Sequence, residues 1–256
     1  MHPSDADIAV RIRGLEKSFG PARVLRGVDL DVARGSVTVV IGLSGAGKSV
    51  LLKLIMGLMR PDAGALEIDG EDICRLPDRE LRKIRRRFGY VFQDGALLDS
   101  MNVFDNVAFP LREHHEGSEA EIEVRVRECL ERVGLEQHGY KMPGNLSGGM
   151  RKRASLARAL VRKPDFLLYD EPTTGLDPIR TAAIDHLIAE TARQDPALTS
   201  IVISHDMEAT FHIATHIAML LDGRILCQGP PAQFRATDDP RVQQFIHGQL
   251  VGPIEV

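Results

Sequence analysis

The chain has 256 residues, of which 43% are hydrophobic and 27% are charged, a composition that argues against a disordered protein. Its formal net charge of −4 argues against a protein whose main role is to coat nucleic acid, because such proteins carry a basic excess. Cys74, Cys129 and Cys227 form neither a CxxC pair nor a metal-ligand spacing, so we expect unpaired packing residues in a reducing compartment.

The N-terminal stretch lacks a basic region followed by a long apolar run, so we expect no secretory signal. Crossing a bilayer as a helix takes roughly 20 apolar residues. The longest apolar runs, VTVVI and IAMLL, are only strand-sized. The sequence therefore predicts a cytoplasmic protein that meets a membrane only through a partner.

The first third of the chain predicts strands, because short runs of β-branched or alternating residues are separated by Gly and Asp. These runs are IAVRIR (8–13), VDLDV (28–32), SVTVVIG (36–42) and ALEIDG (65–70). From about 97 to 160 the sequence becomes mostly helical. Ile122, Val126 and Leu130 recur on one helical face, and Gly134 is a plausible stop for that helix.

The last third alternates strand, helix and strand, which indicates a parallel sheet. DFLLYDEP (165–172) and SIVISHD (200–206) are brief apolar runs, and TAAIDHLIAETAR (181–193) between them is typical of a helix. Asp222-Gly223 predicts a hairpin between IAMLL and RILCQ, and the tail offers one short helix. The expected fold is α/β, with a parallel core, an antiparallel β lobe and a helical insertion.

A glycine-rich segment between a strand and a helix predicts a phosphate site. GLSGAGKS, from Gly42 to Ser49, fits the pattern G-x-x-x-x-G-K-[ST] in the required context. Its glycines let backbone N–H groups converge on phosphate oxygens at a helix N-terminus. We expect Lys48 to reach the β and γ phosphates and Ser49 to hold Mg²⁺.

Polar residues that end other strands add to this prediction, since ligands bind at the carboxyl ends of strands in open α/β sheets. In FLLYDE, Asp170 would hold Mg²⁺ through water and Glu171 would act as the base on an attacking water. His205 could contact the γ phosphate, although a satisfied structural imidazole is the alternative. Gln93 could sense the Mg²⁺ or the water, with a solvated loop residue as its alternative.

Taken together, the motifs resemble the nucleotide-binding subunit of ABC transporters over essentially the whole chain. In order they are GLSGAGKS, Gln93, LSGGM from Leu146 to Met150, FLLYDE, TTGLDP with Asp177, and His205. The resemblance implies a P-loop NTPase (RecA-like) core and a head-to-tail homodimer. In that dimer the motif LSGGM of one chain completes the ATP site of the other.

The resemblance also implies the site residues. Those implied for chemistry are Lys48, Gln93, Glu171 and His205, and those for Mg²⁺ are Ser49, Gln93 and Asp170. Those implied for ATP are Phe19, Gly42, Ser44, Gly45, Ala46, Gly47, Lys48, Ser49, Val50, Ser147, Gly148, Gly149 and Asp177. Phe19 would stack on adenine, and an ordinary core ring is its alternative.

Two positions depart from the family's usual pattern. Val50 stands where many members have Thr, which removes one hydrogen bond to the α phosphate and about 1 kcal/mol of binding. Met150 stands where many members have Gln. Neither departure touches the serine and glycines that bind phosphate.

LSGGMRKRASLARAL is similar to the ATPases of Mla and Mce lipid-transport systems. GALLDSMNVFDNVAFPLREH (95–114) and DPRVQQFIHGQLVGPI (239–254) resemble the same group. This implies a peripheral subunit at the cytoplasmic face of the inner membrane that powers a phospholipid permease. Its further partners would be an Mce-type lipid-binding protein and a small STAS-domain subunit. Met101, Val103, Phe104 and Phe109 could line the permease groove, or simply pack the helical part.

We expect one ABC ATPase domain over residues 1–256. Its nucleotide-binding core would take residues 1–93 and 161–235, its helical part 94–160 and its tail 236–256. The basic run Arg79–Gly89 is interpreted as a solvated helix face and not as a nucleic-acid site.

Three alternatives remain beside lipid transport. The first is another single-cassette transporter, for amino acids, metals or lipoproteins. The second is a non-transport ABC ATPase on nucleic acid or ribosomes, which usually needs two cassettes or a long insertion. The third, a non-hydrolysing scaffold, is disfavoured because Glu171 and His205 are both present.

Overall fold

The computed structural model describes residues 7–254, so the first six residues of the segment expected to carry no secretory signal lie outside the described range. Its strands form a four-stranded sheet in the order β2-β1-β4-β5 and a six-stranded sheet in the order β10-β9-β3-β8-β7-β6. The strands are β1 (Ile8–Phe19), β2 (Ala22–Ala33), β3 (Val37–Ile41), β4 (Ala63–Ile68), β5 (Glu71–Asp72), β6 (Phe88–Val91), β7 (Phe166–Asp170), β8 (Thr199–Ile203), β9 (His216–Leu221) and β10 (Arg224–Gly229).

The larger sheet is parallel from β6 to β9, with β10 antiparallel at its edge. The turn between β9 and β10 has Asp222 at φ 50° and Gly223 at φ 75°, both left-handed, as a two-residue hairpin of this kind needs. The predicted hairpin is therefore confirmed. Because β3, β6, β7 and β8 run the same way, the polar residues that follow them meet at one edge.

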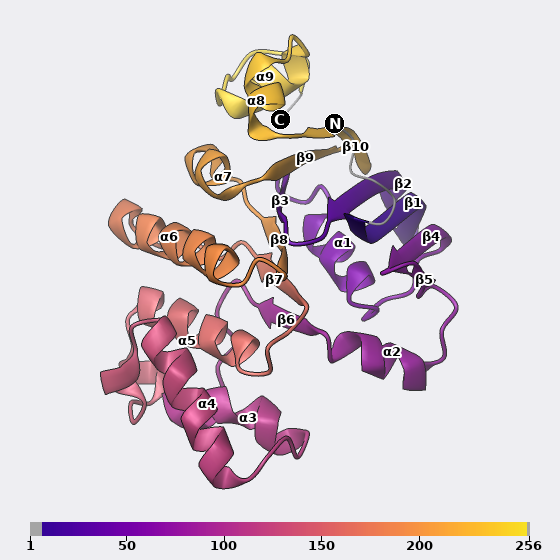
Figure 1. Cartoon of the computed structure of the whole chain (residues 1–256). Coiled ribbons are helices and arrows are strands. Elements are labelled where there is room, and N and C mark those ends of the chain that lie inside the picture. The colour runs from indigo at the N-terminus through magenta and orange to yellow at the C-terminus, as the bar shows by residue number, and fades with distance from the viewer. Residues whose placement is uncertain (1–6, 255–256) are drawn as a thin grey trace.

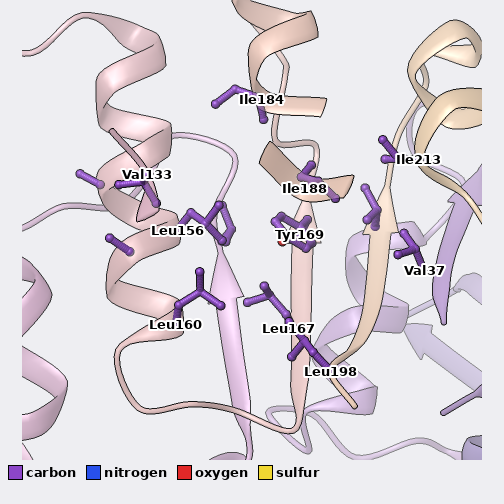
Figure 2. Close-up of a cluster of buried hydrophobic side chains, with 14 of the residues drawn as sticks. Val37, Val133, Leu156, Leu160, Leu167, Tyr169, Ile184, Ile188, Leu198 and Ile213 are labelled. Carbon is purple, nitrogen blue, oxygen red and sulfur yellow. The ribbon is translucent and has the colours of Figure 1, made fainter. Parts of the chain in front are cut away.

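The two faces of this sheet pack against different layers. Successive residues of β7 alternate: Phe166 and Leu168 belong to the apolar cluster that includes β1, β2 and α1, whereas Leu167 and Tyr169 belong to the other cluster. Figure 2 shows part of the second cluster, in which Leu167 and Tyr169 lie among Leu156, Leu160 and Ile188. The sheet therefore separates α1 from α5 and α6.

The helices are α1 (Lys48–Ile55), α2 (Asp78–Arg85), α3 (Val103–Glu113), α4 (Glu119–Arg132), α5 (Gly148–Leu160), α6 (Pro178–Gln194), α7 (Met207–Ile213), α8 (Pro231–Ala236) and α9 (Pro240–Ile246). Figure 1 shows α3, α4 and α5 gathered at one end of the molecule, away from the lobe formed by β1, β2, β4 and β5. The predicted α/β class, with its antiparallel lobe and helical insertion, is confirmed.

Residues at the two ends of helix α4 explain where this helix begins and ends. Ser118 and Glu121 form a capping box at its start, and Ile122, Val126 and Leu130 are buried along one face, as predicted. Gly134, at φ 65°, follows its end. The buried cluster continues from α3–α5 to the sheet, so the proposed boundaries at 93 and 160 stay a prediction.

The basic run from Arg79 to Gly89 is only partly the solvated helix that the sequence predicts. Helix α2 ends at Arg85, and the run then enters strand β6 at Phe88. Leu81 and Ile84 bury one face of α2, and the Arg85 guanidinium donates to the Gly57 carbonyl at 2.8 Å. The last residues of this run are therefore part of the sheet and not of a solvated helix.

All three cysteines pack against the buried clusters, Cys74 on one side of the sheet and Cys129 and Cys227 on the other, as predicted. Burial raises the pKa of each thiol to about 11. The tail holds α9 as the predicted short helix, and the Gln244 amide oxygen accepts from the Ile254 backbone at 2.7 Å. Within residues 7–254, none of the helices combines the length and the apolar character needed to cross a membrane.

Candidate functional site

The loop between β3 and α1 can hold only glycine at two points. A Cβ on Gly42 would lie 2.2 Å from the Leu220 carbonyl oxygen, and one on Gly47 would lie 2.8 Å from a Val24 methyl. Both residues also have positive φ, 153° and 99°. Gly47 is the N-cap of α1 and no side chain caps that helix, so its first N–H groups remain available to an anion. Ser44, Gly45 and Ala46 form the tip of the loop, which is accessible to solvent.

The Lys48 side chain lies against the backbone of this loop. Its ammonium is buried and donates to the carbonyls of Gly42 and Leu43, each at 2.9 Å. Burial lowers the pKa of Lys48, while the nearby Glu171 and Asp170 carboxylates oppose that shift. The charge therefore lies between the loop and the two acids.

Ser49 and Asp170 meet although they are far apart in sequence. The Ser49 hydroxyl donates to one carboxylate oxygen of Asp170 at 2.8 Å, and the Tyr90 hydroxyl donates to the other at 2.9 Å. Burial, followed by the Asp170 charge, raises the pKa of Tyr90. Tyr90 was not among the predicted site residues. The alternation of side chains along β6 could have indicated it, because Tyr90 packs on the same sheet face as Phe88, which is the face of α1.

The donors at this point fit Mg²⁺. A hydroxyl and a carboxylate are hard oxygen ligands, and Mg²⁺ is usually held by one or two carboxylates together with substrate phosphates and water. Across residues 7–254 no group of three or more His, Cys, Asp or Glu side chains could hold a metal by itself. The pair formed by Ser49 and Asp170 suits an ion that arrives with a nucleotide.

Glu171 and His205 come together where β7 and β8 end. The nearer Glu171 carboxylate oxygen lies 3.6 Å from His205 Nδ1 and accepts from the Thr174 hydroxyl at 2.9 Å. Glu171 has φ 48°, a left-handed conformation that is uncommon outside glycine. The His205 side chain is 59% exposed, so it is accessible to a ligand at this edge, and its predicted contact with the γ phosphate stays a prediction. Thr174 was missed, because nothing in TTGLDP singles out one threonine.

Gln93 follows the end of β6, next to β7 in the sheet, so it reaches the same edge as Asp170. Its side chain is exposed and its backbone carbonyl accepts from the Lys152 ammonium.

Phe19, at the end of β1, is 44% exposed with the Lys17 ammonium 5.7 Å from its ring centroid. Phe19 is therefore not the core ring that was its alternative. Val50 packs against the cluster under the β lobe.

The turn from Ser147 to Gly149 opens helix α5. The Ser147 oxygen accepts from the Met150 N–H at 3.3 Å, which leaves the hydroxyl proton free to donate elsewhere. A Cβ on Gly148 would lie 3.3 Å from Leu176, next to Asp177, which caps α6 by accepting from the Arg180 N–H at 3.0 Å. The Met150 side chain packs into the buried cluster. The turn thus lies beside Asp177, while its helix packs on the sheet face opposite α1.

These features define a class of protein, the P-loop nucleotide hydrolases. A glycine loop leads into a helix N-terminus with Lys48 and Ser49, and two carboxylates end a neighbouring parallel strand. A family model described as "ABC transporter" matches residues 25–174. The chain belongs to this family and is an ATP-binding, ATP-hydrolysing cassette of it.

Several relatives are similar over nearly the whole chain. A "probable ribonucleotide transport ATP-binding protein mkl" of Mycobacterium leprae is 46% identical, covering 96% of this chain and 71% of the relative. The "intermembrane phospholipid transport system ATP-binding protein MlaF" of Haemophilus influenzae is 42% identical, covering 96% of this chain and 92% of the relative.

Solved structures share the fold. CbiO1 from Clostridium perfringens, part of an ABC transporter complex, has a TM-score of 0.83 at 29% identity and covers 95% of this chain and 96% of its own. A dimeric ATP-binding cassette in a post-hydrolysis state with ADP and Pi has a TM-score of 0.78 at 32% identity, covering 87% and 98%. The predicted family, fold and ATPase activity are therefore confirmed.

Proposed function

We propose that this chain is the ATP-hydrolysing subunit of a transporter that moves phospholipids or related lipids. The observation that carries the proposal is the similarity to the MlaF proteins, which spans more than nine-tenths of both chains. Met150 and the segments 95–114 and 239–254 suggested lipid transport from the sequence, and the names of these relatives agree with that suggestion. The name of the mycobacterial relatives supports a second candidate, ribonucleotide transport.

The proposed chemistry assigns one task to each group in the site. The loop N–H groups and Lys48 bind the phosphates, Phe19 stacks on adenine, and Ser49 with Asp170 holds Mg²⁺, which neutralises phosphate charge. Glu171 accepts the proton of the attacking water, and His205 contacts the γ phosphate. Gln93 links the state of the site to the rest of the transporter.

The site needs a second copy of the chain. Ser147, Gly148 and Gly149 have free donors at a helix N-terminus, but α5 lies across the sheet from α1. In the proposed head-to-tail dimer they bind the γ phosphate of the partner subunit, and Asp177 lies at the contact between the copies. ATP binding then closes the dimer, and hydrolysis reopens it.

The permease is proposed to dock beside α3 and α4. A groove of about 640 Å³ there is lined by Asn102, Phe104 and Tyr140 among others, and a neighbouring one of about 430 Å³ includes Met101 and Phe109. Val103 could have lined this surface or packed the helical part, and its complete burial in the core matches the second interpretation. In the proposed assembly this chain lies at the cytoplasmic face of the inner membrane with a small STAS-domain subunit bound to it, and an Mce-type lipid-binding protein lies on the periplasmic side.

The test is to purify the chain with its membrane partners and reconstitute the complex in proteoliposomes. With MgATP inside, we expect labelled phospholipid to move between these vesicles and acceptor vesicles or a purified acceptor protein. Lys48→Ala complexes should show no ATP-dependent movement, because that ammonium is required for the phosphates. Movement of labelled ribonucleotides with none of phospholipid would overturn the lipid proposal and favour the second candidate.

A further inference from the structure

Each basic side chain of helix α5 donates hydrogen bonds to one or two backbone carbonyls. Arg151 donates to Leu146, and Arg153 donates to Val133 and Gly134. Lys152 donates to Gln93, and Arg158 donates to Gly95 at 3.0 Å and Ala96 at 2.7 Å. In the sequence this run only marks the resemblance to lipid-transport ATPases. In the structure its cations hold loops against the helix.

Two of these cations hold the same loop. Residues 93–96 follow β6 and include Gln93, and they receive hydrogen bonds from both Lys152 and Arg158. The loop lies close to α5, since a Cβ on Gly95 would come within 3.3 Å of the Arg151 carbonyl oxygen. Gly95 and Ala96 both have positive φ, 77° and 45°, a backbone conformation that costs free energy for alanine. Such a turn persists only where its surroundings fix it.

Lys152 is the more unusual of the two. It is only 6% exposed, and its ammonium donates to the carbonyl of the residue proposed to sense the nucleotide. Burial lowers the pKa of Lys152, and the Asp94 and Glu171 carboxylates oppose this shift. A buried ammonium is costly to the fold, so its place here indicates a role beyond helix packing.

We infer that Lys152 is a positioning residue, which fastens the Gln93 loop to the helix that opens with Ser147–Gly149. Through this contact the loop that meets the nucleotide in one half of the site, and the turn that meets the partner's nucleotide, move as one unit. The inference rests on the proposed roles of Gln93 and Ser147. In this inference Lys152 acts through its hydrogen bond to the Gln93 carbonyl and not by binding the nucleotide itself.

The test compares three variants of the full chain. Lys152→Met keeps the aliphatic stem and removes the donor, Lys152→Arg restores a donor, and Arg153→Met removes the neighbouring cation, which holds a different loop. We expect Lys152→Met to lower kcat about tenfold while KM for ATP stays within twofold, because the γ phosphate site is misplaced but the P-loop is intact. Lys152→Arg should recover at least a third of the wild-type kcat, and Arg153→Met should keep more than half.

Hydrogen exchange gives a second readout that does not need turnover. Amides of residues 92–98 should exchange about tenfold faster in Lys152→Met than in wild type, and at the wild-type rate in Arg153→Met. Unchanged exchange in Lys152→Met, or a kcat loss no larger than that of Arg153→Met, would overturn the inference. An inactive wild-type chain would instead count against the proposed function, and the exchange rates would still decide whether Lys152 fastens the loop.

Discussion

Asp185, in the middle of α6, is a carboxyl group placed where its charge is unfavourable. It is 6% exposed and lines a cavity of about 590 Å³ between α6 and α7, together with Asp206, Glu208 and His212. Burial, with a further contribution from the Asp206 charge, raises the pKa of Asp185 to about 6, and His212 opposes the shift. The folded chain therefore holds a proton here that the unfolded chain has lost by about pH 4.

The sign of the effect on stability follows directly. Between about pH 4 and pH 6 the folded state binds more protons at Asp185 than the unfolded state, so its contribution to the free energy of unfolding falls as pH rises. We expect Asp185→Asn to be about 1–2 kcal/mol more stable than wild type at pH 7.5, and this difference to shrink at pH 5. Urea unfolding of both proteins at the two pH values measures it. A difference that is the same at both pH values would contradict the assignment.

The sequence motifs predicted those site residues whose type and spacing are typical of phosphate binding and hydrolysis. Lys48, Ser49, Asp170, Glu171 and His205 all lie at one edge of the sheet, as strand order requires. Contacts between distant segments could not be predicted, because they depend on where side chains point after folding. The hydroxyl of Tyr90 on Asp170 and the ammonium of Lys152 on Gln93 are of this kind.

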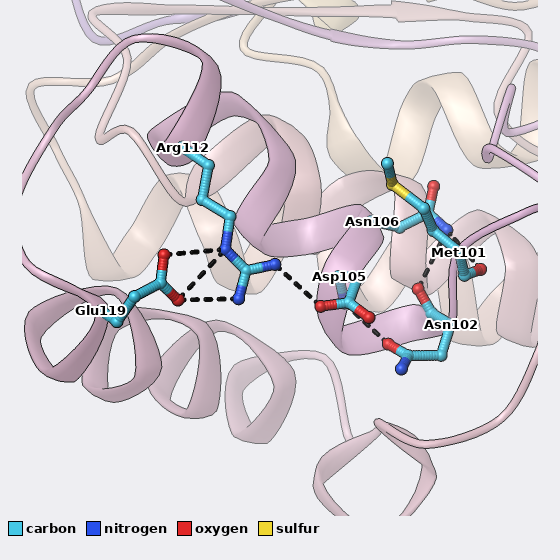
Figure 3. A network of polar contacts seen from close by, with 6 residues as sticks. All are labelled: Met101, Asn102, Asp105, Asn106, Arg112 and Glu119. Carbon is cyan, nitrogen blue, oxygen red and sulfur yellow. Dashed lines mark hydrogen bonds and ion pairs between the residues drawn. The ribbon is translucent and has the colours of Figure 1, made fainter.

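At the scale of elements, the loop before α3 depends on one buried amide. Asn106 is fully buried, and its carboxamide accepts from the Leu98 N–H at 2.7 Å and contacts the carbonyls of Leu98, Met101 and Asn102 at 2.9–3.0 Å. Figure 3 shows Asn106 beside Met101 and Asn102, with Arg112 bridging Asp105 and Glu119 nearby. The Leu98 and Asn102 carbonyls also accept from the Met101 and Asn106 backbone N–H groups, so the side chain adds to these backbone bonds and is the partner of the Leu98 N–H and the Met101 carbonyl.

We expect Asn106→Leu to lower the free energy of unfolding by about 2–4 kcal/mol, because the Leu98 N–H and the Met101 carbonyl lose their side-chain partner at a fully buried position. Arg112→Met is the matched control from the same helix. It breaks ion pairs of 2.8 Å to Asp105 and Glu119, but these side chains are partly exposed, so it should cost at most about 1 kcal/mol. Chemical denaturation of the three proteins checks the order. Equal losses in both variants would show that Asn106 has no special role.

Element boundaries followed the sequence wherever glycine or periodicity marked them. Gly134 ends α4, and Asp222-Gly223 joins β9 to β10. The groove beside α3 was less predictable. Val103 is apolar like Met101 and Phe109, but only the fold decides that Val103 faces the core. Likewise the basic run 79–89 reads as one helix by composition, whereas β6 needs its last residues to pair with β7.

At the scale of the whole molecule, a head-to-tail dimer can be tested by mixing defective chains. Lys48 and Ser147 belong to different ATP sites of one chain in this arrangement. A heterodimer of Lys48→Ala and Ser147→Arg chains therefore has one site with both defects and one intact site. Random pairing makes about half of the dimers mixed, so we expect about a quarter of wild-type ATPase activity if the sites act independently.

A second mixture provides the control. Lys48 and Glu171 interact within one chain, so Lys48→Ala mixed with Glu171→Gln leaves a defect in every site and should recover no activity. Equal recovery in both mixtures, or none in the first when native mass spectrometry shows mixed dimers, would exclude the head-to-tail arrangement. The measurement is phosphate release at fixed total protein.

Glu171 has a left-handed backbone conformation, which favours glycine, but it also carries the carboxylate that the proposed hydrolysis needs. Glycine would adopt φ 48° without strain and could add about 1 kcal/mol of stability, but it would remove the carboxylate beside His205. In the proposed mechanism that carboxylate accepts the proton of the attacking water. The residue that hydrolysis needs at position 171 is therefore not the residue that the backbone conformation favours there.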